Sequence, residues 1–201
     1  MVNVGGSGGV GLEPHHLPGK PVALGEDVVD LVSGMQEVEA ALVVEASYAV
    51  QARTTVWPGT AVCELADGFG LPDALGALAA IGADEATLVA ADAPDLPPLL
   101  LGKLHSALTT AEVAVCPADG GGLVALAARL PVAAWLGEAD AGRSVLSDLG
   151  GSEILSTLRR VAPRRMLHVG AGWHRVRGRA DLARLDPGLE GWEVTRALLG
   201  G

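Results

Sequence analysis

The stretch from Thr87 to Pro98 constrains the fold more than any other part of the chain. It begins with the apolar run Thr87-Leu88-Val89-Ala90-Ala91, in which polar and apolar side chains do not alternate, and continues with Asp92-Ala93-Pro94-Asp95. Such a run is typical of a strand buried on both faces, as in the largely parallel sheets of α/β proteins. The carboxylates then predict a loop at the C-terminal end of the strand. In open α/β sheets ligands bind beyond that end, so Asp92 is the first candidate site residue.

Asp92 has two interpretations. As a functional residue it would ligate Mg²⁺, which is usually held by one or two carboxylates together with substrate phosphates at sites of phosphoryl transfer. As a structural residue Asp92, together with Asp95, would end the strand and cap a helix that begins near Pro97, because Asp is a common N-cap residue. The stretch alone leaves both interpretations open.

Strand and helix patterns alternate along the rest of the chain. Besides 87–91, apolar runs predict strands near residues 1–4, 39–45, 60–65, 113–116, 123–128 and 166–169. Helical spacing or an early proline predicts helices near residues 26–36, 72–81, 97–108, 152–161, 179–185 and 191–199. This alternation predicts an α/β fold with a mostly parallel sheet covered by helices on both faces. A length of 201 residues is typical of one domain, which we expect to span residues 1–201.

A short strand at the N-terminus leads directly into a glycine-rich segment, Gly5-Gly6-Ser7-Gly8-Gly9-Val10-Gly11. Backbone N–H groups of such a loop can approach a phosphate closely, because glycine adopts φ values that other residues avoid. The segment is neither a Walker loop nor an established dinucleotide-binding fingerprint. Its composition is also that of a linker. The segment is therefore a candidate phosphate loop, with the linker interpretation still open.

Positively charged residues occur at two places that would suit an anionic ligand. Lys20 would lie near the glycine-rich segment, although it could equally be a solvent-exposed lysine in a turn. The short stretch 174–179 contains His174, Arg175, Arg177 and Arg179. Such a cluster is either solvated surface or a local positive field for a phosphate, which arginine can hold bidentately.

The overall charge argues against some classes of partner. The formal net charge is −10 and the isoelectric point is near 4.8, so nucleic acids and anionic membranes would be repelled. A small anionic substrate stays compatible if a metal or local basic groups neutralise it. Cys63 and Cys116 lie far apart without CxxC spacing, which indicates buried free thiols. With no secretory leader and no apolar run of membrane-spanning length, we expect a cytoplasmic protein.

Taken together, three segments resemble the nucleotide-diphospho-sugar transferase superfamily. Within it, the chain is similar to small nucleotidyltransferases such as molybdenum-cofactor guanylyltransferase and methylerythritol-phosphate cytidylyltransferase. The segments are Gly5-Gly6-Ser7-Gly8 with the later Gly19-Lys20-Pro21, Asp92-Ala93-Pro94-Asp95-Leu96, and Pro117-Ala118-Asp119-Gly120-Gly121. Residues 176–182 stand where the family has its closing metal-site segment. The ordered set also resembles phospholactate guanylyltransferases and a group of small glycosyltransferases.

The resemblance implies a Rossmann-like three-layer α/β/α sandwich of the GT-A type with a mostly parallel mixed sheet. It also implies that a small phosphorylated acceptor attacks the α-phosphate of a nucleoside triphosphate and releases pyrophosphate. Lys20 and Asp92 would act in catalysis, and Asp92 would hold Mg²⁺. The residues that would bind the nucleotide are Gly5, Gly6, Ser7, Gly8, Gly9, His15, Asp119, Gly120, Gly121 and Arg177. The base, the acceptor and the oligomeric state, a homodimer included, are left open.

The chain departs from the family pattern at three charged positions. The arginine of the family loop is replaced by Val10 or Gly11, a lysine by His15, and a closing Asp or Asn by Arg177, which removes a second metal ligand. Losing three such groups would ordinarily raise a reaction barrier considerably. Three functions are therefore compatible with the sequence: a Mg²⁺-assisted nucleotidyltransferase, a catalytically silent nucleotide-binding or partner-binding domain, and a glycosyltransferase that uses a nucleotide sugar.

Overall fold

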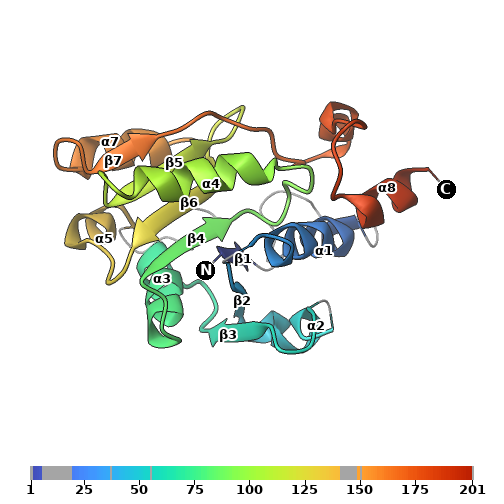
Figure 1. Cartoon of the computed structure of the whole chain (residues 1–201), viewed down its shortest axis with the longest axis horizontal. Helices are drawn as coiled ribbons and strands as arrows, with labels where there is room; N and C mark the ends of the chain where they lie inside the picture. The colour runs from blue at the N-terminus through green and yellow to red at the C-terminus, as the bar shows by residue number, and fades with distance from the viewer. Residues whose placement is uncertain are drawn as a thin grey trace.

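The computed structural model describes residues 2–5, 20–36, 38–54, 56–140, 149 and 151–200. Within them a seven-stranded sheet runs through the centre of the molecule in the order β3-β2-β1-β4-β6-β5-β7 (Figure 1). Its strands are β1 (Val2–Gly5), β2 (Ala40–Glu45), β3 (Ala61–Leu65), β4 (Glu85–Val89), β5 (Val113–Pro117), β6 (Leu123–Arg129) and β7 (Leu167–Val169).

The sheet is mixed, and one strand accounts for its antiparallel pairs. Strand β1 pairs in parallel with β2 on one side and β4 on the other, and β2 pairs in parallel with β3. Strand β6 is antiparallel to both β4 and β5, while β5 and β7 are parallel. All strands except β6 therefore end at the same edge of the sheet. The strand order reverses between β1 and β4, which is where open α/β sheets form a ligand crevice.

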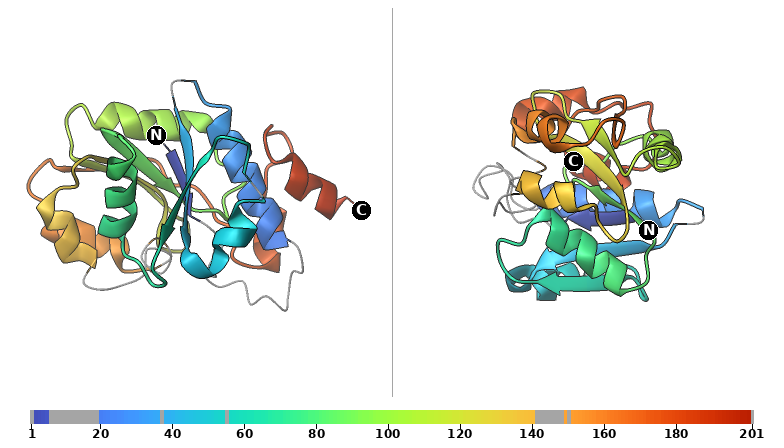
Figure 2. Two further views of the ribbon diagram at one scale, coloured as in Figure 1. Left: turned by 90° about the horizontal axis from the view of Figure 1, so that it is seen from below. Right: turned by 90° about the vertical axis from the view of Figure 1, so that its left-hand side faces the viewer.

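Helices cover both faces of the sheet and make it the middle layer of three (Figure 2). On one face the buried side chains come from α1 (Lys20–Ser33), α2 (Ala49–Ala52) and α4 (Pro98–Ala107). On the other they come from α3 (Leu71–Ala80), α5 (Ala134–Asp140) and α7 (Ile154–Val161). Residues of β2, β5 and β6 contribute to both cores, because successive side chains of a strand point to opposite faces. The predicted three-layer fold with a mostly parallel mixed sheet is confirmed.

The C-terminal residues pack against the start of α1. They form the 3₁₀ helix η2 (Arg179–Arg184) and the helix α8 (Glu193–Leu199), while a shorter 3₁₀ helix, η1 (Ala46–Tyr48), precedes α2. A third apolar cluster joins Leu24 of α1 to Val176, Leu185 and Trp192. The segment from Val176 to Leu199 is thereby fixed against the start of α1. Within the described residues no helix is both long enough and apolar enough to cross a bilayer.

The sequence prediction was wrong at three elements. Helix α1 begins at Lys20 rather than near residue 26, because Pro21 is favourable in a first helical turn. Helix α5 was not predicted, since its buried side chains Trp135 and Leu136 are adjacent and do not form a helical repeat. Residues 179–184 form a 3₁₀ helix instead of an α-helix.

Both cysteines are free thiols. Cys116 is buried as predicted, and Cys63 is half-buried. Burial, with a smaller contribution from the negative charge of Asp119, raises the pKa of Cys116 to about 12. Since the thiolate is the reactive form, this raised pKa disfavours a reactive role for Cys116.

Candidate functional site

The candidate site lies at the sheet edge where β1 and β4 end. Val4 pairs with Val89, so Gly5, at the end of β1, lies beside the turn that follows β4 and contains Asp92. Gly25, in the second turn of α1, lies beside the Asp92 turn: an added Cβ would be in ordinary van der Waals contact with the Cβ of Ala91, at 3.9 Å. The end of β1, the start of α1 and the Asp92 turn are therefore brought together.

Asp92 forms a two-pronged ion pair with Arg175. The Arg175 Nε donates to Asp92 Oδ1 at 2.6 Å, and Nη2 donates to Oδ2 at 3.0 Å. The Nη1 of Arg175 donates to the carbonyl oxygens of Leu123 and Leu149 at 3.1 and 2.9 Å. Only 5% of the Arg175 side chain and 14% of the Asp92 side chain are exposed. The guanidinium is fixed by three parts of the chain at once.

The segment that carries Arg175 reaches the site along strand β5. Beyond β7, the N–H groups of Gly170 and Trp173 donate to Val115 and Pro117, and Val176 N–H donates to Asp92 O at 2.7 Å. The backbone thus follows β5 to its end and crosses to the Asp92 turn. Arg175 and Arg177 lie on either side of Val176, whose side chain packs in the cluster with Leu24. This path explains how a charged segment near the C-terminus meets the ends of central strands.

The turn after β5 contributes a second part of the site. Gly120, Gly121 and Gly122 all have positive φ, at 78°, 100° and 84°. An added Cβ at Gly121 would lie 3.0 Å from the Cβ of Ser152, so the turn packs tightly on the loop before α7. Arg177 Nη2 donates to the Gly121 carbonyl oxygen. The predicted nucleotide-binding residues Gly120, Gly121 and Arg177 are therefore neighbours in space.

Arg177 retains an unused donor. Its Nε is buried and has no hydrogen-bond partner in the described part of the chain. Burial lowers the pKa of Arg177, as does the positive charge of Arg175, while Asp92 and Asp181 oppose this effect. A guanidinium remains protonated under these conditions. An anion beside the Nε would satisfy both its donor capacity and its charge.

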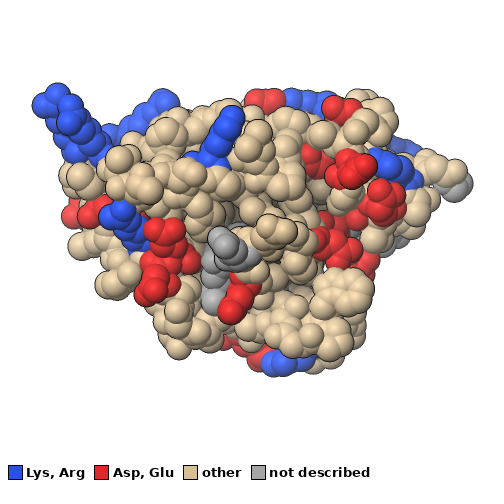
Figure 3. Space-filling model, in the orientation of Figure 1, with Lys and Arg blue, Asp and Glu red and all other residues tan. Residues whose placement is uncertain are grey.

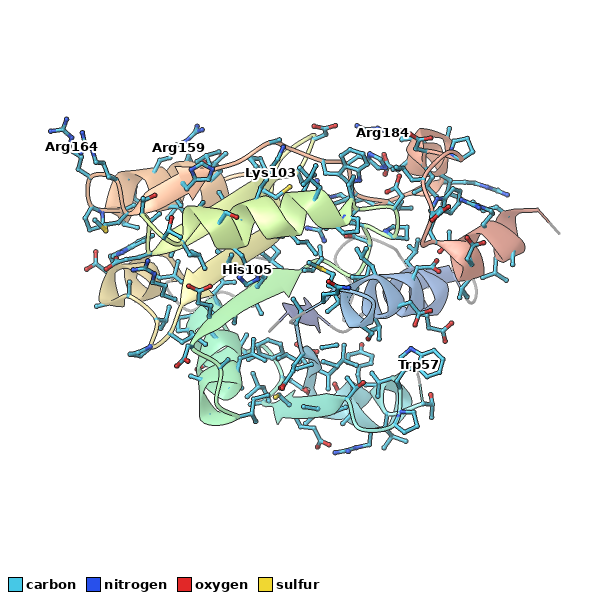
Figure 4. All side chains as sticks on the ribbon, viewed as in Figure 1. Trp57, Lys103, His105, Arg159, Arg164 and Arg184 are labelled. Carbon is cyan, nitrogen blue, oxygen red and sulfur yellow. The ribbon has the colours of Figure 1, made fainter. Side chains whose placement is uncertain are left out.

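Asp119 is positioned by its backbone and paired at the surface. Its N–H donates to Trp173 O at 2.9 Å, and its exposed carboxylate forms an ion pair with Arg184 of η2. Arg184 lies at the upper edge of the molecule, above the end of α4 (Figure 4). The carboxylate of Asp119 is thus engaged with η2.

The helix-capping interpretation of Asp92 and Asp95 is wrong. The N-cap residue of α4 is Pro97, without a side-chain cap. Asp95 is almost fully buried and accepts hydrogen bonds from Trp173 Nε1 at 3.2 Å and from Asp186 N–H at 3.1 Å. His174 Nε2 lies 3.0 Å from Asp95 Oδ2, within ion-pair distance but outside hydrogen-bond geometry. Asp95 therefore fastens the C-terminal segment to the Asp92 turn.

The remaining predicted residues are less fully placed. Gly5 ends β1, and Lys20 is the first residue of α1, with a side chain outside the described set. Gly6, Ser7, Gly8, Gly9 and His15 lie outside the described residues. Their roles stay predictions, as do the proposed functions of the placed residues.

The environment of Asp92 does not fit a resident divalent metal. Arg175 engages both of its carboxylate oxygens. Among the described residues, no three His, Cys, Asp or Glu side chains gather where they could hold a metal ion. Arg175 therefore occupies the two oxygens with which Asp92 was predicted to ligate Mg²⁺. Sequence reasoning assigned Arg177 to the nucleotide and gave Arg175 no role beyond the arginine cluster, so the pairing of Arg175 with Asp92 was missed. The only available signal was that an arginine follows His174 directly in a cluster within an acidic chain.

Comparison with known proteins identifies the fold. No protein-family model and no curated protein sequence matches the chain. Among solved structures, a protein from Desulfovibrio desulfuricans with a suggested nucleotide-diphospho-sugar transferase activity matches with a TM-score of 0.64 and 16% identity, covering 99% of this chain and 94% of that one. A CMP:2-keto-3-deoxy-manno-octonic acid synthetase complexed with CTP matches with a TM-score of 0.60 and 14% identity, covering 100% and 98%.

A third match concerns metal. A protein from Mycobacterium tuberculosis, solved in complex with manganese, has a TM-score of 0.54 and 20% identity, covering 94% of this chain and 97% of that one. At such identities the likeness establishes the fold. The chain therefore has the fold of the nucleotide-diphospho-sugar transferases, the superfamily that its three sequence motifs resemble.

Proposed function

We propose that the chain is a nucleotidyltransferase that moves a nucleotidyl group from a nucleoside triphosphate to a small phosphorylated acceptor. The observation that carries the proposal is the meeting of the Asp92 turn, the Gly120-Gly121 turn and Arg177 at the edge where the strand order reverses. This is the ligand crevice of an open α/β sheet. The synthetase of the same fold that was solved with CTP supports a nucleotide as the ligand.

The proposed reaction is a displacement at the α-phosphorus. An oxygen of the acceptor phosphate forms the new P–O bond, the bond between the α-phosphorus and its bridging oxygen breaks, and pyrophosphate leaves with that electron pair. Such reactions depend mainly on positioning and charge neutralisation. Lys20 and the loop from Gly5 to Gly9, with His15, would hold the triphosphate beside the N-terminus of α1. Asp119, with Gly120 and Gly121, would shape the nucleotide side of the crevice.

Arg177 supplies the specific support for an anionic ligand. Its Nε is a buried donor without a partner in the described residues, and such a group is costly unless a ligand satisfies it. The surface alone would not attract an anion: acidic side chains gather over α1 and α8 (Figure 3), and the net charge is −10. A phosphate must therefore be held by local cations such as Arg177.

Magnesium has a place in this proposal as part of the substrate. A nucleoside triphosphate carries Mg²⁺ on its phosphates, and the manganese complex of the mycobacterial protein supports a divalent ion in this fold. Within the chain, Asp92 would act chiefly by fixing Arg175 and the turn between β4 and α4. Lys20 and Arg177 would supply the protein's own positive charge.

A second candidate function is glycosyl transfer from a nucleotide sugar. The Desulfovibrio protein, for which a nucleotide-diphospho-sugar transferase activity has been suggested, favours this function. The same crevice would hold the diphosphate of the nucleotide sugar. The two reactions differ in their released product, because nucleotidyl transfer releases pyrophosphate and glycosyl transfer releases a nucleoside diphosphate.

A thermal-shift screen tests the proposal. Nucleoside triphosphates, diphosphates and nucleotide sugars are compared, with and without Mg²⁺, because a ligand that binds the folded state raises its melting temperature. We expect one triphosphate to stabilise the protein, Arg177→Gln to weaken that effect and the matched control Arg179→Gln, at an exposed arginine, to leave it intact. Stabilisation by nucleotide sugars alone would favour the second function. Binding of a triphosphate without release of pyrophosphate would favour a catalytically silent domain. No response to any nucleotide would contradict both transferase functions and a nucleotide-binding silent domain, and would leave a partner-binding domain.

A further inference from the structure

Asp92 lies where the resemblance to the family predicts a metal ligand, but in this chain its carboxylate is paired with Arg175. We infer that Arg175 takes the place of a protein-bound divalent metal at Asp92, so that the chain itself supplies an anion site built from arginines and holds no metal of its own. This deepens the proposed function, and rests on it only for the identity of the anion. It revises the sequence-based prediction that Asp92 ligates Mg²⁺.

The geometry of Arg175 favours a permanent counter-ion. Its fork takes one oxygen of Asp92 on each side, at 2.6 and 3.0 Å, which is the arrangement that a guanidinium forms with a carboxylate. Its third nitrogen is held by the carbonyls of Leu123 and Leu149. To release Asp92 to a metal, the guanidinium would have to abandon both carbonyls as well. Because the Arg175 side chain is only 5% exposed, water has little access to replace these two carbonyl oxygens as hydrogen-bond acceptors.

The charges around Asp92 also disfavour a second cation. Arg175 balances the single negative charge of Asp92, and Arg177 is near enough to Arg175 for the two to repel. Asp181, whose Oδ2 accepts hydrogen bonds from the N–H groups of Arg177 and Gly178, offsets part of the Arg177 charge. A divalent ion at Asp92 would therefore lie against a guanidinium. An anion would instead meet the unused Nε of Arg177.

A manganese titration without nucleotide tests this inference. Free Mn²⁺ is measured by electron paramagnetic resonance with the wild-type chain, Asp92→Asn, Arg175→Met, and the double variant. We expect the wild-type chain and Asp92→Asn to bind Mn²⁺ equally weakly. Arg175→Met, which frees the carboxylate, should gain one site at least tenfold tighter, and the double variant should lose it.

Two results would overturn the inference. One is a wild-type Mn²⁺ site that a folded Asp92→Asn lacks, and this comparison does not need Arg175→Met to fold. The other is a folded Arg175→Met that gains no site, which would show that Arg175 is not what excludes the metal. Nucleotide binding is measured separately by calorimetry in chelator. There the inference predicts retained triphosphate binding, weakened about tenfold by Arg177→Gln. Absence of nucleotide binding in every condition would refute the proposed function while leaving the manganese result valid.

Discussion

Asp92 and Arg175 form a nearly buried ion pair in which each charge has its hydrogen-bond partners within the protein. Taking two ions out of water costs free energy, which is recovered only when the geometry is good and the remaining donors are satisfied. Here the carboxylate is satisfied by the fork, and Arg175 by two carbonyls in addition. Removing one partner would leave the other buried and unpaired.

Asp92→Ala is therefore expected to destabilise the chain by about 3 to 5 kcal/mol. The matched control is Asp119→Ala, which removes an ion pair whose side chains are 56% and 43% exposed and should cost about 0 to 1 kcal/mol. Urea denaturation of the three proteins measures both values. Equal losses for the two variants would show that the pair with Arg175 is not the buried anchor described above.

The glycines of the turn after β5 provide a second test at this scale. Gly121 has a φ of +100°, and an added Cβ would meet Ser152 at 3.0 Å; Gly59 has a similar φ of +96° with nothing within 4 Å. Gly59→Ala should cost about 1 to 2 kcal/mol through backbone strain alone. Gly121→Ala should cost more, because Ser152 must also move. Chemical denaturation of both variants checks the order, and a smaller loss for Gly121→Ala would contradict the tight packing of this turn.

At the scale of elements, the sequence predicted the buried strands and did not predict which strands pair. The run at 87–91 predicted a strand that the structure places two residues earlier, as β4 (Glu85–Val89), and its residues 86–89 are buried because helices cover both faces. That β6 lies between β4 and β5 and runs antiparallel to both depends on tertiary packing, which the local pattern does not contain. The Asp92 and Arg175 pair joins residues 83 positions apart, so either charge alone was equally compatible with solvated surface.

Helix α8 is attached to α1 by a buried carboxylate. Asp27 accepts hydrogen bonds from Val194 N–H at 2.9 Å and Thr195 N–H at 2.8 Å, in the first turn of α8. Desolvation raises the pKa of Asp27 above its ordinary value, although these hydrogen bonds oppose the shift. The folded state therefore binds a proton more readily than the unfolded state does.

The pH dependence of stability follows from this sign. A group whose pKa is raised on folding contributes stability that is fully present below its unfolded pKa, near 3.8 for Asp27, and that is lost as pH rises through the folded pKa. The free energy of unfolding of the wild-type chain, relative to Asp27→Asn, should thus fall as pH rises above about 4. Denaturation of both proteins over a pH series measures the difference. If the free-energy difference between wild type and Asp27→Asn instead grew with pH, the pKa of Asp27 would be lowered on folding, which would contradict its desolvation.

At the scale of the whole molecule, the sheet brings Gly5, Asp92, the turn at 119–121 and Arg177 to one edge. Six strands end there, β1 and β4 reverse the order beside it, and the segment after β7 follows β5 to the same place. The order of the sequence motifs predicted this fold, which its solved neighbours share. We propose that Arg177, unexpected from the family pattern, would bind an anion at this edge, because its buried Nε has no partner among the described residues.

Hydrogen–deuterium exchange of the wild-type chain, with and without a nucleoside triphosphate, tests this account most directly. A ligand protects the backbone that it covers or stabilises. The account predicts slower exchange in residues 91–93, 119–122 and 175–178, and unchanged exchange at the opposite edge, in the loop 81–84 before β4. Protection at that opposite edge alone, or none at a triphosphate concentration that raises the melting temperature, would contradict the placement of the nucleotide site.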